Sequence, residues 1–170
     1  MDKVSAYIKE NWTKTFHPAE ELAGSVKVDH PYVSPCAVDV YTEIFYWDTY
    51  FINKGLMLDG YSEQARYNVD NIAKFIDTLG YMPNANYITD RSQPPFFTRM
   101  VYECYKENGD VAFIEKYIGT ILKEHEFWEK NRKNPIGLNS YGNSGSDREI
   151  MNNYLWHHGR VQEESDVPEE

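Results

Sequence analysis

The chain contains few cysteines and no long apolar run. Of its 170 residues only Cys36 and Cys104 are cysteines, and they do not form a C-x-x-C pair. This argues against a disulfide framework or a cysteine metal site, and Cys104 is expected as a buried, reduced thiol. The adjacent His157 and His158 lack acidic or cysteine partners at ligand spacing, so neither a metal nor a cofactor is expected. Residues 1–5 lack the apolar core of a secretory signal and no stretch is long enough for a membrane span, which predicts a cytoplasmic protein without membrane association.

Basic residues are also scarce. The formal net charge is −10, and the 17 Lys and Arg residues are scattered along the chain. Because nucleic acids and anionic membranes are bound through clustered positive charge, neither is an expected partner. Aromatic residues, in contrast, make up 15% of the chain, and aromatic faces pack well against the C–H groups of sugar rings. A tyrosine-rich helical core would give the same composition, so composition alone leaves both interpretations open.

Apolar residues recur with a helical period along most of the chain. Residues 62–79 and 110–128 each carry one apolar face, which predicts amphipathic helices. Residues 44–58 and 96–105 are apolar over a broader surface, which is typical of more deeply buried helices. Buried and amphipathic helices thus alternate with a period of roughly 46 residues, as in stacked helical hairpins. The sequence therefore predicts an all-α fold.

The same pattern predicts helix ends and the environment of one histidine. Ser62 and Asp110 are the expected N-caps of the two amphipathic helices, and Gly80 is expected to end the first of them. His125 falls on the apolar face predicted for the second helix, so we expect it in the core rather than as a ligand. That face consists of Ile114, Tyr117, Ile118, Ile121, Leu122, His125 and Trp128.

Three short motifs follow one another along the chain, and the first and the last of them lie near the starts of the two more buried helices. They read EIFYWDTYF at 43–51, GYMPNAN at 80–86 and RSQPPFF at 91–97. The two prolines of the third motif fix the backbone φ where a helix begins, so Arg91 and Gln93 are expected on a rigid turn. A proline-capped helix beside a solvated arginine is the purely structural interpretation. The functional interpretation is a polar ligand site on one rim of the helical assembly.

In this order the motifs resemble those of the trehalases of glycoside hydrolase family 37, which read E-x-Y-Y-W-D-x-Y-F, G-x-x-P-N-G-N and S-R-S-Q-P-P-x-F. The resemblance covers Glu43 to about Trp128, with a weaker similarity at 135–141. It implies an (α/α)6 toroid of helical hairpins. It also implies hydrolysis of the α-glucosidic bond of trehalose or a related disaccharide by an inverting mechanism.

Two helix pairs cannot close a six-pair ring, so residues 1–170 are expected to form the N-terminal part of one (α/α)6 catalytic domain. Within it, residues 1–40 are expected to form an N-terminal helix and a lead-in loop. Residues 41–131 are expected to form the helix pairs that carry the substrate-binding residues. Residues 132–170 are expected to be a loop and a polar, acidic tail, which truncation explains better than a naturally disordered end.

The resemblance implies a substrate pocket without catalytic residues in this chain. An aromatic face would pack on a glucose ring, while carboxylate, amide and guanidinium groups would bind its hydroxyls. The family carries its catalytic acid and base, an Asp and a Glu, in motifs downstream of the matching segment, and neither has a counterpart here. Glu43 and Asp48 are not expected to form such a pair, because they would point to different faces of one helix. The substrate-binding residues implied are Tyr41, Trp47, Asp48, Asn84, Arg91 and Gln93.

One position departs from the family pattern. The segment before Trp47 in the family contains P-G-G-R-F, whose arginine contacts sugar, whereas Val40 stands in the arginine's place here. An apolar side chain cannot donate that hydrogen bond, so strict specificity for trehalose is not expected. Two alternatives to an enzyme stay open, namely a non-catalytic sugar-binding protein and a helical-repeat scaffold that binds another protein through its aromatic surface. The sequence does not determine the oligomeric state.

Overall fold

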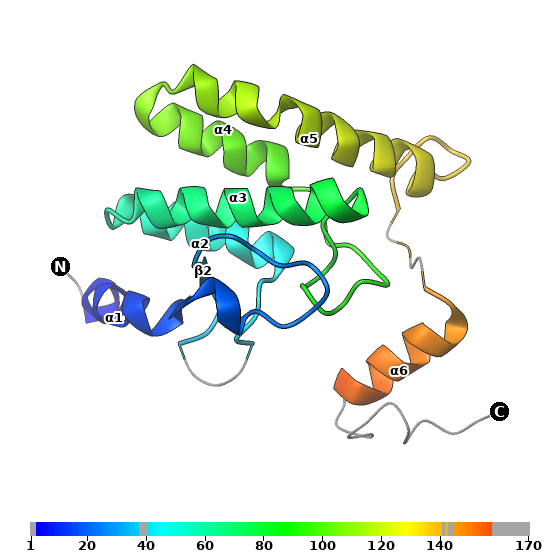
Figure 1. The fold of residues 1–170 in the computed structure, drawn as a ribbon, viewed down its shortest axis with the longest axis horizontal. Coiled ribbons are helices and arrows are strands. Elements are labelled where there is room, and N and C mark those ends of the chain that lie inside the picture. The colour runs from blue at the N-terminus through cyan, green and yellow to red at the C-terminus, as the bar shows by residue number, and fades with distance from the viewer. Residues whose placement is uncertain (1–2, 38–40, 141, 143–144, 158–170) are drawn as a thin grey trace.

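The computed structural model describes residues 3–37, 41–140, 142 and 145–157 (Figure 1). Val40 and the acidic tail beyond His157 lie outside the described residues, as does the side chain of His157. The described part is mostly helical, which confirms the predicted class. Its elements are α1 (Lys3–Asn11), η1 (Trp12–Thr15), β1 (Phe16–His17), η2 (Ala19–Glu21), β2 (Tyr32–Val33), α2 (Tyr46–Leu58), α3 (Ser62–Leu79), α4 (Phe97–Asn108), α5 (Val111–Asn131) and α6 (Asp147–His157).

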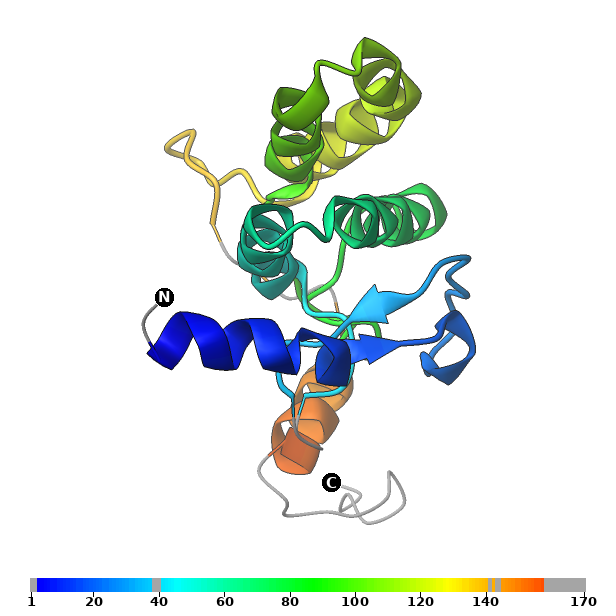
Figure 2. The ribbon, with the colours of Figure 1, turned by 90° about the vertical axis from the view of Figure 1, so that its left-hand side faces the viewer.

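Helices α2 to α5 form two hairpins that stack on each other. The pair α4 and α5 lies over the pair α2 and α3, and α3 contacts both helices of the other pair (Figures 1 and 2). The strands and α1 lie on the opposite side of α2 and α3 from α4 and α5 (Figure 2). The hairpin arrangement is therefore the one predicted from alternating helix types.

Two of the three predicted helix ends are confirmed. The Asp110 side chain accepts a hydrogen bond from the Phe113 backbone N–H at 3.2 Å and so caps α5. Gly80 ends α3 with φ of +90°, a conformation that favours glycine. The N-cap predicted at Ser62 is wrong, because Tyr61 occupies that position and the Ser62 hydroxyl donates to the side chain of Glu107 instead.

The main core lies between the two hairpins, with α3 at its centre. Cys104 is buried there and has no disulfide partner, as predicted, and burial raises the pKa of its thiol to about 12. The side chains buried in this core from α3, α4 and α5 are Val69, Ile72, Ala73, Phe75, Ile76, Phe97, Met100, Val101, Cys104, Phe113 and Tyr117.

The buried face of α5 differs from the predicted one. His125 is exposed, so its predicted place in the core is wrong, and Ile118 and Leu122 are 47% and 60% exposed. The spacing of apolar residues predicted the wrong face because two polar side chains, Thr120 and Glu124, are buried on the packed face of α5. Each forms a hydrogen bond there, Thr120 with Asp77 and Glu124 with Tyr46. The buried residues of α5 are Phe113, Tyr117, Thr120, Glu124 and Trp128.

Helix α2 is buried on one side only. Phe51 and Leu58 are 61% and 84% exposed, so the deeper burial predicted for the helix at residues 44–58 is not found. The packed side includes the polar Asn53, whose carboxamide oxygen accepts a hydrogen bond from the Asn68 side chain at 2.8 Å. This pair joins α2 to α3.

The strands and α6 were not predicted. β1 and β2 pair antiparallel, with Phe16 opposite Val33 and His17 opposite Tyr32. Strands of two residues are too short to show an alternating pattern. Helix α6 falls in the stretch expected to be loop and tail, and it lies away from the two hairpins in Figure 1.

Candidate functional site

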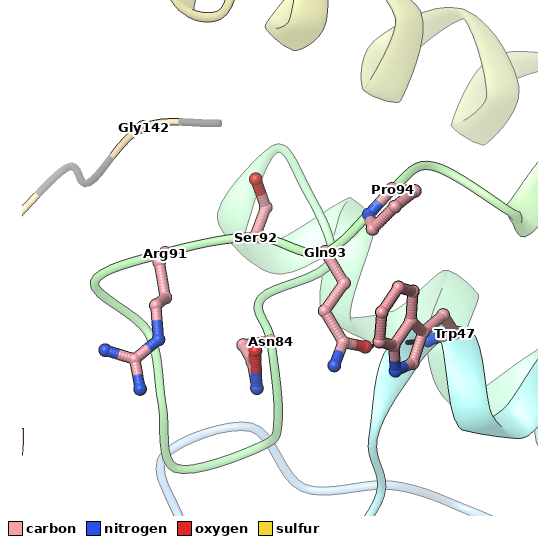
Figure 3. A pocket seen from close by; sticks show the side chains of 7 residues that line it. All are labelled: Trp47, Asn84, Arg91, Ser92, Gln93, Pro94 and Gly142. Carbon is pink, nitrogen blue, oxygen red and sulfur yellow. Dashed lines mark hydrogen bonds between the residues drawn. The ribbon is translucent and has the colours of Figure 1, made fainter. Parts of the chain in front are cut away.

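A cleft of about 440 Å³ lies where α2 begins and the segment before α4 passes beside it (Figure 3). Four of the six residues predicted to bind substrate line it, with Trp47 in the first turn of α2 and the other three in the loop between α3 and α4. In Figure 3 the side chains of Asn84, Arg91 and Gln93 point to the same side of the segment, whereas Ser92 points away from them. The described residues that line the cleft are Trp47, Asn84, Arg91, Ser92, Gln93, Pro94 and Gly142.

Backbone hydrogen bonds fix the relative places of these segments. The Tyr46 N–H donates to the Asn84 carbonyl oxygen at 3.2 Å, and the Asn84 N–H donates to the Arg91 carbonyl oxygen at 2.8 Å. Asn84 therefore joins the start of α2 to the turn that carries Arg91. These bonds fix the spacing of the backbone at the positions that carry the cleft side chains.

Gln93 completes the first turn of α2 from a distant part of the chain. The N-cap residue of α2 is Phe45, whose side chain has no oxygen to accept a backbone N–H. The Gln93 Oε1 accepts the hydrogen bond from the Trp47 backbone N–H at 2.8 Å. Since Oε1 is used in this way, the carboxamide nitrogen is the group that donates to Asp48, with which Gln93 also forms a hydrogen bond.

Asp48 lies next to the cleft but is not among its described lining residues. Its side chain is partly buried, and burial raises the pKa of the carboxyl group. Hydrogen bonds from its own backbone N–H and from the side chains of Trp47 and Gln93 oppose this rise. Asp48 therefore holds two cleft residues through its carboxylate.

Tyr41 is not brought into the cleft. Its side chain is 54% exposed, and its ring packs edge-on against Phe45 with 5.5 Å between ring centroids. Its φ of +57° is left-handed, which is uncommon for a bulky residue. Tyr41 is therefore not among the described residues that line the cleft.

Two charged residues beside the cleft were missed by the sequence analysis. Asp90 is 5% exposed, and neither of its carboxylate oxygens has a hydrogen-bond partner among the described residues. Its nearest charge is the Arg91 guanidinium, with 3.5 Å between Nη1 and Oδ2. On the other side of the turn, the buried Arg132 donates from Nε to the Ser92 hydroxyl at 3.3 Å. The adjacency of Asp90 to Arg91 was a signal in the sequence, whereas the contact with Arg132 was not.

The cleft offers an exposed indole face, two carboxamides and a guanidinium group, and none of its described lining residues is acidic. Such a set suits a neutral ligand rich in hydroxyl groups. No three His, Cys, Asp or Glu side chains come together as a metal site within the described residues. No described helix combines the length and the apolar character needed to span a membrane.

Comparisons with known proteins agree with these motifs. The family model described as Trehalase matches residues 2–160. A probable trehalase of Oryza sativa subsp. japonica is 34% identical over 60% of this chain and 18% of its own length. The periplasmic trehalase of Pseudomonas aeruginosa is 34% identical over 74% of this chain and 23% of its own length. The periplasmic trehalase of Xanthomonas campestris pv. campestris is 40% identical over 58% of this chain and 17% of its own length.

The comparisons also correct one expectation. The two bacterial relatives are periplasmic trehalases, which contradicts the cytoplasmic location expected from the sequence. The chain spans about a fifth of the length of the curated relatives it matches. Because the family model covers nearly all of its residues, the chain belongs to the trehalase family.

Proposed function

We propose that this chain supplies part of the sugar-binding site of an enzyme that hydrolyses the α-glucosidic bond of trehalose or a related disaccharide with inversion. The cleft carries the proposal, because Trp47, Asn84 and Arg91 line it together. Hydrogen bonds within the protein hold these residues in place, and membership of the trehalase family gives the cleft its expected ligand class.

Each cleft residue has a role suited to a glucose unit. The indole of Trp47 is 43% exposed and provides an apolar face for the sugar ring. Asn84 both donates and accepts hydrogen bonds, and Arg91 donates two in parallel. A charged hydrogen bond to a sugar hydroxyl contributes roughly 1.5–3 kcal/mol. Asp48 accepts from sugar hydroxyls at the edge of the cleft while it holds Gln93.

The catalytic carboxyl groups are proposed to lie outside this chain. Inversion requires one carboxylic acid to protonate the leaving oxygen and one carboxylate to activate water on the opposite face of the sugar. The carboxylate of Asp48 is engaged by its neighbours, and the described lining residues include no acid. The chain then contributes to binding and orientation of the substrate rather than to proton transfer.

Glucose release by the complete gene product that contains this chain tests the proposal. Trehalose should be hydrolysed, and NMR should show equal amounts of α- and β-glucose as the first products, because inversion affects one of the two units. Arg91→Ala and Asp48→Ala should each lower kcat/KM at least tenfold, as expected for a lost charged hydrogen bond of roughly 1.5–3 kcal/mol. Arg99→Ala is the matched control, since Arg99 is exposed on α4 and does not line the cleft.

A non-catalytic sugar-binding protein is the second candidate, and the lack of an acid among the described lining residues favours it. The same experiment separates the two. Trehalose binding without glucose release would support the second candidate, and glucose that appears only as the α-anomer would contradict inversion.

A further inference from the structure

Glu124 is a buried acid that the proposed function does not use. It lies on α5, which contributes no described residue to the cleft, and it is 3% exposed. Its Oε1 accepts a hydrogen bond from the Tyr46 hydroxyl at 2.6 Å. Tyr46 is the first residue of α2 and directly precedes Trp47, so the contact reaches the start of the helix that borders the cleft.

The Tyr46 hydroxyl also holds the start of α4. It accepts a hydrogen bond from the Phe97 backbone N–H at 2.8 Å. Phe97 begins α4 and follows the two prolines that come after Gln93. The hydroxyl therefore connects the first residue of α2 with the first residue of α4, and Glu124 accepts the proton that this hydroxyl donates.

A third segment reaches the same carboxyl group. The Met82 backbone forms a hydrogen bond with Glu124, and the Met82 side chain is fully buried. Met82 lies two residues before Asn84, whose carbonyl oxygen accepts from the Tyr46 N–H at 3.2 Å. The starts of α2 and α4 and the loop that carries Asn84 thus meet, directly or through one hydroxyl, at Glu124.

Burying a carboxyl group in the core costs free energy, because the group loses its contact with water. The donors described for Glu124 are the neutral Tyr46 hydroxyl and Met82 N–H, and burial raises the pKa of the carboxyl to about 7. An apolar side chain would avoid this cost. In return, the carboxyl group accepts hydrogen bonds from two segments beside the cleft, one through the Tyr46 hydroxyl and one through the Met82 backbone. An apolar side chain could accept neither.

We propose that Glu124 is a positioning residue for the cleft, holding the start of α2, the loop before Asn84 and, through Tyr46, the start of α4 in register. The inference rests on the proposed function, since the register matters for activity only if the cleft binds sugar. Glu124 is not among the described residues that line the cleft, and it acts through Tyr46 and Met82.

Tyr117 provides a matched control. Like Tyr46, it is a buried tyrosine whose hydroxyl donates to a carboxylate on another helix, in this case Asp70 on α3. None of the residues in that contact belongs to the segments around the cleft. Tyr46→Phe and Tyr117→Phe therefore each delete one hydroxyl between packed helices, and only the first deletion affects the cleft.

The test compares the two variants in the complete gene product, with melting temperature, kcat and KM for trehalose as readouts. Tyr46→Phe should raise KM about two- to tenfold, the effect of one lost hydrogen bond on substrate binding, with a smaller change in kcat. Tyr117→Phe should leave KM within about twofold at a similar loss of melting temperature. Glu124→Gln keeps an acceptor oxygen for Tyr46 and should retain a near-normal KM, whereas Glu124→Leu should not. Equal KM values in the two tyrosine variants, or equal KM values in Glu124→Gln and Glu124→Leu, would overturn the inference.

A second readout does not depend on sugar. The backbone amide NMR signals of Trp47 and Asn84 should shift in Tyr46→Phe and Glu124→Leu and stay in place in Tyr117→Phe. If the wild-type protein neither binds nor hydrolyses trehalose, the proposed function fails, and these signals still decide whether Glu124 sets the register. Unshifted signals in both Tyr46→Phe and Glu124→Leu would refute the positioning role even in an active enzyme.

Discussion

The Gln93 Oε1 lies 2.8 Å from the Trp47 backbone nitrogen and accepts its hydrogen bond, so the first turn of α2 is capped by a residue 46 positions away. Gln93→Leu removes this acceptor and should destabilise the protein by roughly 1 kcal/mol, a typical cost for a lost N-cap. Gln93→Glu keeps an acceptor oxygen for the Trp47 N–H, although its charge repels Asp48, and it should lose less of the melting temperature than Gln93→Leu. Equal losses of melting temperature in the two variants would contradict the capping role.

Gln93→Glu should nevertheless impair sugar binding. It replaces the carboxamide nitrogen that donates to Asp48 with a second carboxylate, and two adjacent negative charges raise the pKa of the pair. KM for trehalose should therefore rise in Gln93→Glu, although the acceptor that caps α2 is kept.

Asp90 is expected to act on the ligand through Arg91. Asp90→Asn removes the charge that lies 3.5 Å from the Arg91 guanidinium. Without this ion pair the Arg91 side chain should sample other orientations. KM for trehalose should rise by less than it does in Arg91→Ala. In an Arg91→Ala background the same Asp90→Asn change should have no further effect on KM, and a full additive effect in the double variant would show that Asp90 acts independently.

Glu124 should make stability depend on pH between about 4.5 and 7. Its pKa is raised from 4.5 to about 7 in the fold, so the unfolded chain loses this proton first as pH rises. The contribution of Glu124 to stability is then fully present below about pH 4.5 and is lost as pH rises through about 7, by on the order of 3 kcal/mol. The pKa of the neighbouring Tyr46 hydroxyl is raised well above its ordinary value, so that group stays protonated throughout.

Urea unfolding of the wild type and of Glu124→Gln at pH 4.5 and pH 8 measures this contribution. The free energy of unfolding of the variant, relative to the wild type, should increase between the two pH values. Parallel pH profiles would contradict the raised pKa.

The 170-residue chain by itself is expected to self-associate. Phe51, Leu58, Ile118 and Leu122 are exposed on helices, and open apolar surface drives association. Light scattering during size-exclusion chromatography should show oligomers, and Leu122→Ser should reduce them more than Leu138→Ser, since Leu138 is 62% exposed outside the helices. A monodisperse wild-type monomer would contradict this expectation.

Local patterns in the sequence predicted part of the fold. Helical periodicity located α2 to α5, and Gly80 and Asp110 marked ends that depend only on their neighbours in the chain. The packed face of α5 could not be found in this way, because Glu124 is accommodated by a hydroxyl 78 residues away. The wrong prediction that His125 lies in the core has the same cause.

The sequence also predicted only part of the candidate site. Family motifs identified Trp47, Asn84, Arg91 and Gln93, which the structure brings to one cleft. The same motifs did not show that Gln93 caps α2, since the pairing of a carboxamide with a distant N–H leaves no local signal.

The most direct test of the central claim is a titration of the isotope-labelled complete gene product with a trehalose analogue that cannot be hydrolysed, followed by NMR. The amide signals of Trp47, Asn84 and Arg91 should shift saturably. Arg91→Ala should raise the Kd at least tenfold, as expected for a lost charged hydrogen bond, while Arg99→Ala leaves it unchanged. Saturable binding that leaves all three signals in place, or an equal Kd in the two arginine variants, would show that the cleft is not the sugar site.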